Sequence, residues 1–166
     1  AGGHAGTLSP FALVGEIREF YDGLIVLSGS IANGDAVLAA QAMGADLAYM
    51  GTRFIATTEA NASDDYKNGI TQASASDVIY TNLFTGVHGN YLRESIVKAG
   101  LDPDHLPEAD KSKMNFGSGG NSAAKAWKDI WGVGQGVAVI DEVLPTAELV
   151  NQLEAEYRAA RARLAL

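Results

Sequence analysis

The sequence predicts an α/β fold in which short parallel strands alternate with helices. Three short apolar runs have the composition of buried strands, over residues 24–27, 46–50 and 77–81. The segments between them have the apolar spacing or the alanine content that is typical of helices. A helix between two successive strands carries the chain back to its starting edge, so the strands run parallel.

Capping residues and apolar spacing predict helices in the segments around the strands. Ser9-Pro10 is a typical helix start and predicts a helix over residues 11–20. Helices are also predicted over residues 35–43 and around residues 64–72, and Gly51–Phe54 is expected as a turn. The last helix runs from about Pro145 to Arg163. Its apolar stripe contains Leu149, Leu153, Tyr157 and Leu164, and its charged residues, Glu156 among them, form the solvated face.

Residues 82–136 interrupt this alternation. The segment is expected to hold a helix, a turn, a mobile polar stretch and a short helix, over residues 91–98, 102–107, 111–121 and 125–131. We therefore expect one domain, residues 1–166, with a loop and helix excursion at about 82–136. A closed (β/α)₈ barrel takes about 250 residues. The strand count accordingly fits the later βα units of such a barrel, a partial TIM-barrel domain.

Composition limits the partners. The chain has 12 Lys and Arg against 20 Asp and Glu, a formal net charge of −8, which disfavours nucleic acid and anionic membranes. No apolar run is long enough to span a bilayer. There is no cysteine, which excludes disulfides and fits a cytoplasmic protein, and the three scattered histidines have no metal-ligand spacing.

The chain starts without an initiator Met, inside what has the composition of a loop motif. We therefore expect earlier residues that supply the first strands. Without them, strand edges would be exposed, and the chain would pair with another chain, as in a homo-oligomer, or aggregate.

The candidate site consists of glycine-bearing turns that follow strands. Gly2–Gly6 would follow a strand before residue 1, Ser28–Gly34 follows the first visible strand, and Gly51–Phe54 follows the second. In a barrel these turns lie on one face, where active sites are built. Their backbone N–H groups at helix N-termini and the hydroxyls of Ser30 and Thr52 can bind a phosphate. A tight turn without a ligand is the alternative for each turn taken alone.

His4 is the candidate general base, because an imidazole can take up a proton near neutral pH. A flexible terminus is the alternative interpretation of its glycine-rich surroundings. His88 either lines the site or stabilises its loop, and His105 is expected on the surface. Arg53 either braces its loop through a carboxylate or contacts the ligand, and the glycine-rich stretch 132–136 is a second ligand-facing candidate.

Four segments of the chain resemble, in order, the signature segments of nitronate monooxygenases, formerly called 2-nitropropane dioxygenases. They are Ala1–Gly6 (Ala-Gly-Gly-His-Ala-Gly), Leu27–Gly34, Met50–Phe54 and Val133–Gly136. Phe84–Tyr91 is also similar to a segment of bacterial members. The resemblance covers essentially the whole chain.

The resemblance implies a TIM barrel with a smaller inserted domain that binds FMN non-covalently. Its functional residues map onto this sequence one by one. His4 matches the family's catalytic histidine. Gly2 and Gly3 match residues against the flavin, Gly29, Ser30, Gly51 and Thr52 match the FMN phosphate turns, and Gln135 and Gly136 match a segment that approaches the flavin. Ser30 departs from the pattern, since many members have a second glycine there.

The implied reaction is oxidation of an alkyl nitronate by O₂ to a carbonyl compound and nitrite, with FMN passing the electrons to O₂. His4 would take the α-proton when the substrate is a neutral nitroalkane. Two other interpretations stay open. One is a flavin-dependent oxidoreductase similar to the enoyl-ACP reductases, which have a close version of the Ala-Gly-Gly-His motif. The other is a half-barrel that binds phosphate ligands or a partner chain without turnover.

Overall fold

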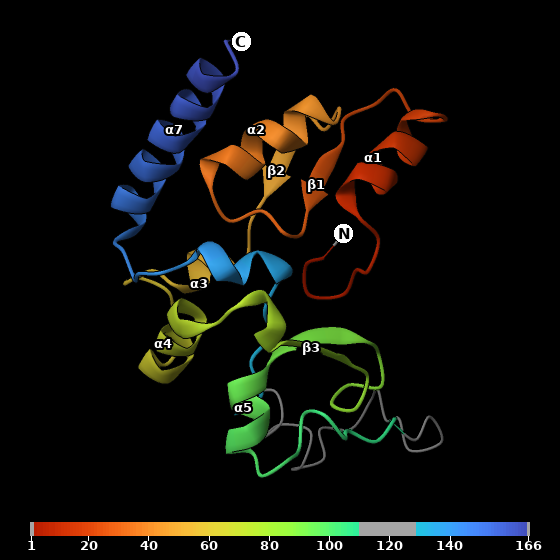
Figure 1. The fold of residues 1–166 in the computed structure, drawn as a ribbon, viewed down its shortest axis with the longest axis vertical. Helices are drawn as coiled ribbons and strands as arrows, with labels where there is room; N and C mark the ends of the chain where they lie inside the picture. Colours follow the sequence, from red (N-terminus) through yellow and green to blue (C-terminus); the bar gives the residue numbers. More distant parts are fainter. Residues whose placement is uncertain (1, 110–128, 166) are drawn as a thin grey trace.

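The computed structural model describes residues 2–109 and 129–165 (Figure 1). The chain is α/β, and its elements follow in this order: α1 (Pro10–Arg18), β1 (Val26–Ser28), α2 (Gly34–Ala42), β2 (Leu47–Tyr49), α3 (Thr52–Ile55), α4 (Asp64–Gln72), η1 (Ala75–Asp77), β3 (Val78–Thr81), β4 (Gly89–Leu92), α5 (Arg93–Lys98), η3 (Gln135–Val139) and α7 (Thr146–Arg163). The expected mobile stretch 111–121 and the first part of the expected helix 125–131 lie outside the described residues.

The first two predicted strands are confirmed as a parallel pair. Val26 lies opposite Leu47 and Ser28 opposite Tyr49, so β1 and β2 end at the same edge. Leu27 is buried against Val14 of α1, while the alternate residues Val26, Leu47 and Tyr49 are exposed. The turns after both strands therefore start side by side, as the parallel arrangement requires.

The third predicted strand is not a parallel neighbour of the first two. β3 instead forms an antiparallel pair with β4, with Val78 opposite Leu92 and Thr81 opposite Gly89. The helix expected over residues 91–98 begins only at Arg93, because Gly89–Leu92 is a strand whose four residues are buried. An apolar run indicates a strand but not its partner, and the hairpin supplies the ladder bonds that a parallel neighbour would have supplied.

The last helix packs against α2 at very close range. The hydroxyl of Tyr157 donates to Gln41 at 2.6 Å, and Leu149 is buried as predicted. Glu156, expected on the solvated face, instead accepts a 2.7 Å hydrogen bond from the backbone N–H of Gly34, and Leu164 of the expected stripe is exposed. The predicted stripe is therefore kept at Leu149, Leu153 and Tyr157 and ends before Leu164. Glu156 lies beside it, because the first turn of α2 binds its carboxylate.

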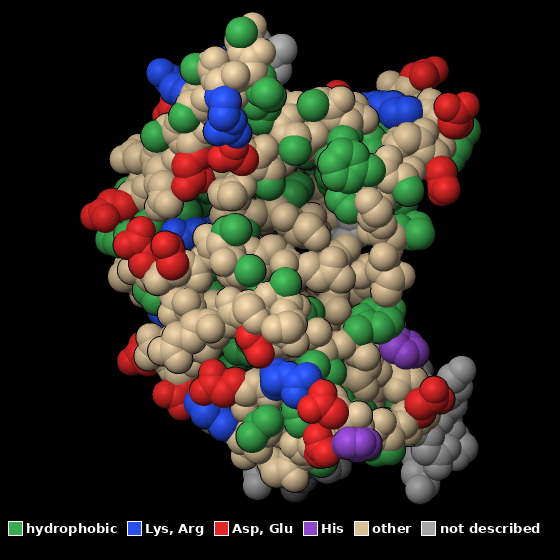
Figure 2. Space-filling view, viewed as in Figure 1, with side chains coloured by type: hydrophobic (Ala, Val, Ile, Leu, Met, Phe, Trp, Pro, Cys, Tyr) green, Lys and Arg blue, Asp and Glu red, His purple; other side chains and the backbone are tan. Residues whose placement is uncertain are grey.

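Figure 2 shows acidic and basic side chains spread over one face of the molecule, without separation into two patches. Within the described ranges, no helix combines the length and the apolar character needed to cross a membrane.

Candidate functional site

The loop that carries His4 is fixed at three points. The backbone N–H of Gln135 donates to the carbonyl of Gly2 at 2.7 Å, and the backbone N–H of Asn90 donates to the carbonyl of His4 at 2.6 Å. The side-chain amide of Asn90 also donates to the carbonyl of Gly3. Asn90 is only 1% exposed, so these bonds form in a water-poor interior where they hold best. The structure therefore gives residues 2–4 a defined position between β4 and η3.

A cavity of about 280 Å³ lies where this loop meets the turns after β1 and β2. Seven of the nine site residues predicted from the sequence line it: Gly3, His4, Gly29, Ser30, Gly51, Thr52 and Gly136. Gly2 and Gln135 are not among the lining residues. A Cβ on Gly2 would meet the side chains of both Ser30 and Gln135, so Gly2 lets the loop approach the cavity wall closely.

The turn after β1 has a backbone that few residues adopt. Gly29 has φ +106° and Ser30 has φ +59°, both in the region that favours glycine. Ser30 thus occupies a left-handed position at a cost of about 1–2 kcal/mol, a cost that a glycine would not incur. This conformation follows β1 directly and bends the chain around the cavity.

Donors for an anion in this cavity come from the turns and hydroxyls rather than from the start of α2. The first N–H of α2, on Gly34, already donates to Glu156, and the N–H of Ala36 donates to its cap Asn33. The expectation of a phosphate at the N-terminus of this helix is therefore not supported. Gly51–Phe54, expected as a turn, contains the short helix α3, whose first residue Thr52 lines the cavity.

A second and larger cavity, of about 990 Å³, shares His4 and Gly132 with the first. One wall is the stacked pair of Tyr66 and Trp131, whose ring centroids are 5.2 Å apart. The Tyr66 hydroxyl donates to the carbonyl of Gly132, and burial raises the pKa of Tyr66 to about 12. Tyr66 therefore stays a neutral donor at physiological pH, and His4 lies at the boundary between the two cavities.

Two glycines leave room for the His4 ring. A Cβ on Gly132 would lie 3.0 Å from Nδ1 of His4, and a Cβ on Gly89 would lie 3.1 Å from Cε1. Both distances are shorter than normal carbon contacts, so a side chain at either position would displace the imidazole. Gly89 and Gly132 thus act as spacers around the candidate base.

The other three candidates from the sequence lie away from both cavities. His88 is exposed and stacks on Tyr80 at 4.9 Å, and His105 is exposed in its turn, as expected. The hydrogen bond between His105 and Asp102 raises the pKa of that imidazole. Arg53 is 2% exposed, and its guanidinium donates to the carbonyl of Glu142 at 3.1 Å, so it braces the segment before α7. Desolvation lowers the pKa of Arg53, against the opposing effect of Glu142 and other carboxylates.

Sequence reasoning missed the residues of β4 that hold His4. Tyr91 was expected as the first residue of a helix, and Gly89 and Asn90 had no assigned role. The only sequence signal was a glycine and an asparagine beside aromatic residues. Their role follows from the burial of this segment, whose backbone polar groups must all find hydrogen-bond partners. That burial is visible only once β4 is paired with β3.

Comparisons with known proteins agree on one family. The family model described as nitronate monooxygenase matches residues 1–156. A nitronate monooxygenase of Paraburkholderia phytofirmans is 31% identical over 95% of this chain and 47% of its own length. A probable nitronate monooxygenase of Staphylococcus saprophyticus is 32% identical over 65% of this chain and 34% of its own length. The chain thus spans about half or less of the length of these curated relatives.

Two solved structures are similar to this chain over 99% of its length. A nitroalkane oxidase from Streptomyces ansochromogenes has a TM-score of 0.74 at 30% identity, with 51% of that chain covered. A mutant FabK from Thermotoga maritima has a TM-score of 0.71 at 25% identity, with 52% of that chain covered.

Proposed function

The chain belongs to the nitronate monooxygenase family, and from that premise we propose that it supplies the FMN site and the general base of an enzyme that oxidises alkyl nitronates and nitroalkanes. The products would be a carbonyl compound and nitrite, with O₂ as oxidant. The observation that carries the proposal is the position of His4 on the cavity formed by the turns after β1 and β2.

The cavity has the donor chemistry that a flavin phosphate needs. Gly29, Ser30, Gly51 and Thr52 line it with glycine backbone and hydroxyl groups, which are hydrogen-bond donors for phosphate oxygens. The cradle is narrow, because a Cβ on Gly136 would lie 3.0 Å from the carbonyl carbon of Ser30. A volume of about 280 Å³ is at the lower end for ligand pockets, which suits the phosphate end of a cofactor.

His4 would act at the substrate carbon next to the nitro group. A ring nitrogen of His4 takes the α-proton of a neutral nitroalkane and so generates the nitronate, which carries the electrons to be removed. FMN, when bound, supplies the redox chemistry between the nitronate and O₂. The bonds from Asn90 to the carbonyls of Gly3 and His4 hold the base at a fixed place during the proton transfer.

We also propose that residues 1–166 are the later βα units of a TIM barrel. The parallel pair β1–β2, with both cavity turns at its carboxyl edge, supports this arrangement. The antiparallel β3–β4 hairpin and α5 would then belong to the smaller inserted part. We further propose that the rest of the barrel supplies additional FMN-binding residues. The assembled protein would be a homo-oligomer.

A flavin-dependent reductase of the enoyl-ACP type is the second candidate, because its Ala-Gly-Gly-His motif is close to Ala1–His4. The TM-scores of 0.74 and 0.71 for the two solved structures do not separate the candidates. Both candidates need the same flavin site, so the electron donor distinguishes them.

The purified chain, reconstituted with FMN, should consume O₂ and release nitrite when propyl-2-nitronate is added. Under anaerobic conditions the nitronate should bleach the flavin absorbance faster than NADH or NADPH does. Faster bleaching by the pyridine nucleotide would favour the reductase instead. Bound FMN that neither donor reduces would favour a half-barrel without turnover.

A further inference from the structure

The hydroxyl of Tyr91 is a buried polar group without a partner. Tyr91 lies on β4 and is 3% exposed, and its hydroxyl makes no hydrogen bond to any residue that the structure describes. Buried hydroxyls are nearly always bonded in folded proteins, so an orphaned one requires a physical explanation. Its explanation must lie with a group that can reach it.

His4 is that group. The rings of Tyr91 and His4 meet edge to face at 5.3 Å between centroids, with an interplanar angle of 86°. Phe84 packs on Tyr91 at 5.1 Å, and the two aromatic contacts hold the Tyr91 ring in place. A Cβ on Gly89 would lie 3.0 Å from the Tyr91 hydroxyl oxygen and 3.1 Å from Cε1 of His4, so the glycine borders both groups.

We propose that Tyr91 is a positioning residue for His4, whose ring N–H donates a hydrogen bond to the hydroxyl oxygen of Tyr91. A 180° flip of the imidazole about its Cβ–Cγ bond exchanges the positions of Cε1 and Nε2, so the flipped ring turns Nε2 towards the hydroxyl. The N–H bonded to Tyr91 then leaves the lone pair of the other nitrogen for the substrate. The hydrogen bond made by one ring nitrogen of a histidine commonly determines which of the two nitrogens carries the proton.

The consequence for turnover rests on the proposed function, in which His4 removes a proton. For metal-binding histidines, removing the partner that orients the ring commonly costs about 10- to 100-fold in activity, and we expect a loss of the same order here. If the hydroxyl has no function, Tyr91→Phe should leave activity unchanged and raise the stability of the fold, because replacing an unbonded buried hydroxyl by hydrogen relieves its desolvation penalty. Tyr91→Phe separates these two cases with a change of one oxygen atom.

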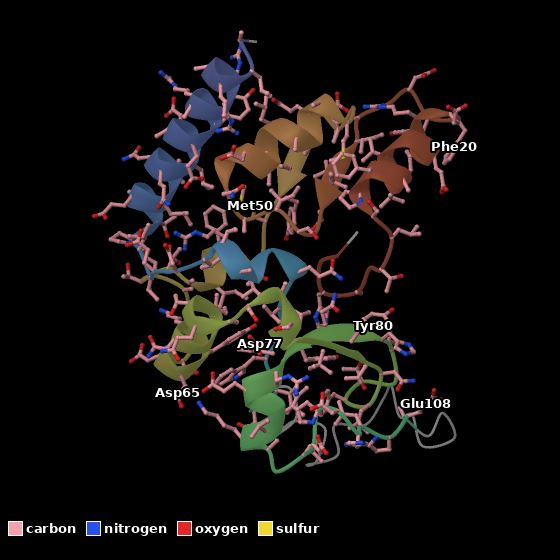
Figure 3. The ribbon with its side chains drawn as sticks, viewed as in Figure 1. Phe20, Met50, Asp65, Asp77, Tyr80 and Glu108 are labelled. Atoms are coloured by element: carbon pink, nitrogen blue, oxygen red, sulfur yellow. The ribbon has the colours of Figure 1, made fainter. Side chains whose placement is uncertain are left out.

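The direct test is the His4 ring N–H signal in ¹H–¹⁵N NMR spectra of the full chain labelled at histidine. His4→Ala assigns the signal. We expect wild-type protein to show a ring N–H protected from exchange with water, and Tyr91→Phe to lose that protection. Tyr80→Phe is the matched control, since Tyr80 lies on β3 (Figure 3), stacks on the exposed His88 and lines neither cavity. It should keep the His4 signal unchanged.

The kinetic test compares two substrates in the FMN-reconstituted chain. Tyr91→Phe should lower kcat/KM for a neutral nitroalkane by about 10-fold or more and leave kcat/KM for the preformed nitronate within about twofold. In the His4→Ala background the same change should have no further effect. The melting temperature should fall slightly, because the ring N–H of His4 loses its acceptor.

Two results would overturn the proposal. One is an equally protected His4 N–H in wild type and Tyr91→Phe. The other is unchanged activity, or an equal loss on both substrates, in a Tyr91→Phe variant that melts at a higher temperature than wild type. If wild-type protein oxidises neither substrate, the proposed function fails, while the NMR comparison still decides the contact between Tyr91 and His4.

Discussion

His4→Ala is expected to lower the turnover of a neutral nitroalkane by about 10²- to 10⁴-fold, the usual range for loss of a general base. Oxidation of a preformed nitronate should be largely spared, because that substrate has already lost the α-proton. The physical reason is the position of His4, which lines both cavities and is fixed through its backbone by Asn90. O₂ consumption with nitroethane and with its nitronate at the same pH measures the difference.

The matched control for this variant is His88→Ala. His88 is exposed, stacks on Tyr80 and lines neither cavity, so its removal should change neither rate. An equal loss on both substrates in His4→Ala would remove the proton-transfer role and leave His4 as a residue that binds cofactor or substrate.

Gly34→Ala should destabilise the fold more than most single substitutions in this chain, by about 1–3 kcal/mol or more. The added Cβ would fall against the backbone nitrogen of Tyr157 and 2.5 Å from the carbonyl oxygen of Leu153. Backbone atoms of a helix cannot turn aside as a side chain can, so α7 must move away from α2. The bond from the N–H of Gly34 to Glu156 would lengthen with it. Urea denaturation followed by circular dichroism measures the loss.

Gly15→Ala is the control for this substitution. Gly15 lies inside α1, where an added Cβ has nothing within 4 Å, so alanine should raise stability through helix propensity alone, by about 0.5–1 kcal/mol. Equal stabilities for Gly34→Ala and wild type would mean that α2 and α7 are not in the close contact described.

The parts of the fold that could be predicted from sequence are those whose signals are local. Pro10 after Ser9 marked α1, the apolar runs marked β1 and β2, and the alanine-rich segment before Gly44 marked α2. Each of these depends on capping, periodicity or burial within a few residues. The inward position of Glu156 on α7 could not be predicted, because Glu156 faces inward only when the N–H of Gly34 is there to bond it.

The pairing of β3 with β4 shows the same limit for strands. Val78–Thr81 has a clear strand signal, but nothing within those residues distinguishes a parallel neighbour from a hairpin partner. β4 itself was hidden, because Gly89 and Asn90 have low strand propensity and the residues from Arg93 onward have a helical pattern. Tertiary contacts with the loop at Gly3 and His4 determine its structure.

Some parts of the candidate site could be predicted from sequence and others could not. The turns at Gly29–Ser30 and Gly51–Thr52 follow strands directly, so parallel order alone predicts that they meet, and both line the cavity. Asn90 and Tyr91 act on His4 across more than eighty residues of sequence, a relation that no local pattern contains. Glycine spacers such as Gly132 are likewise recognisable only when the ring that they accommodate is in place.

The central claim, that the turns after β1 and β2 hold the phosphate of FMN, is tested most directly by comparing the binding of FMN and riboflavin, which differ only in that phosphate. We expect the chain to bind FMN about 100-fold more tightly in a flavin fluorescence titration. Gly51→Asp should abolish this preference, because a carboxylate at this cavity-lining position would repel the phosphate, and the added Cβ itself has nothing within 4 Å. Equal affinities for FMN and riboflavin in the wild-type chain would contradict the claim.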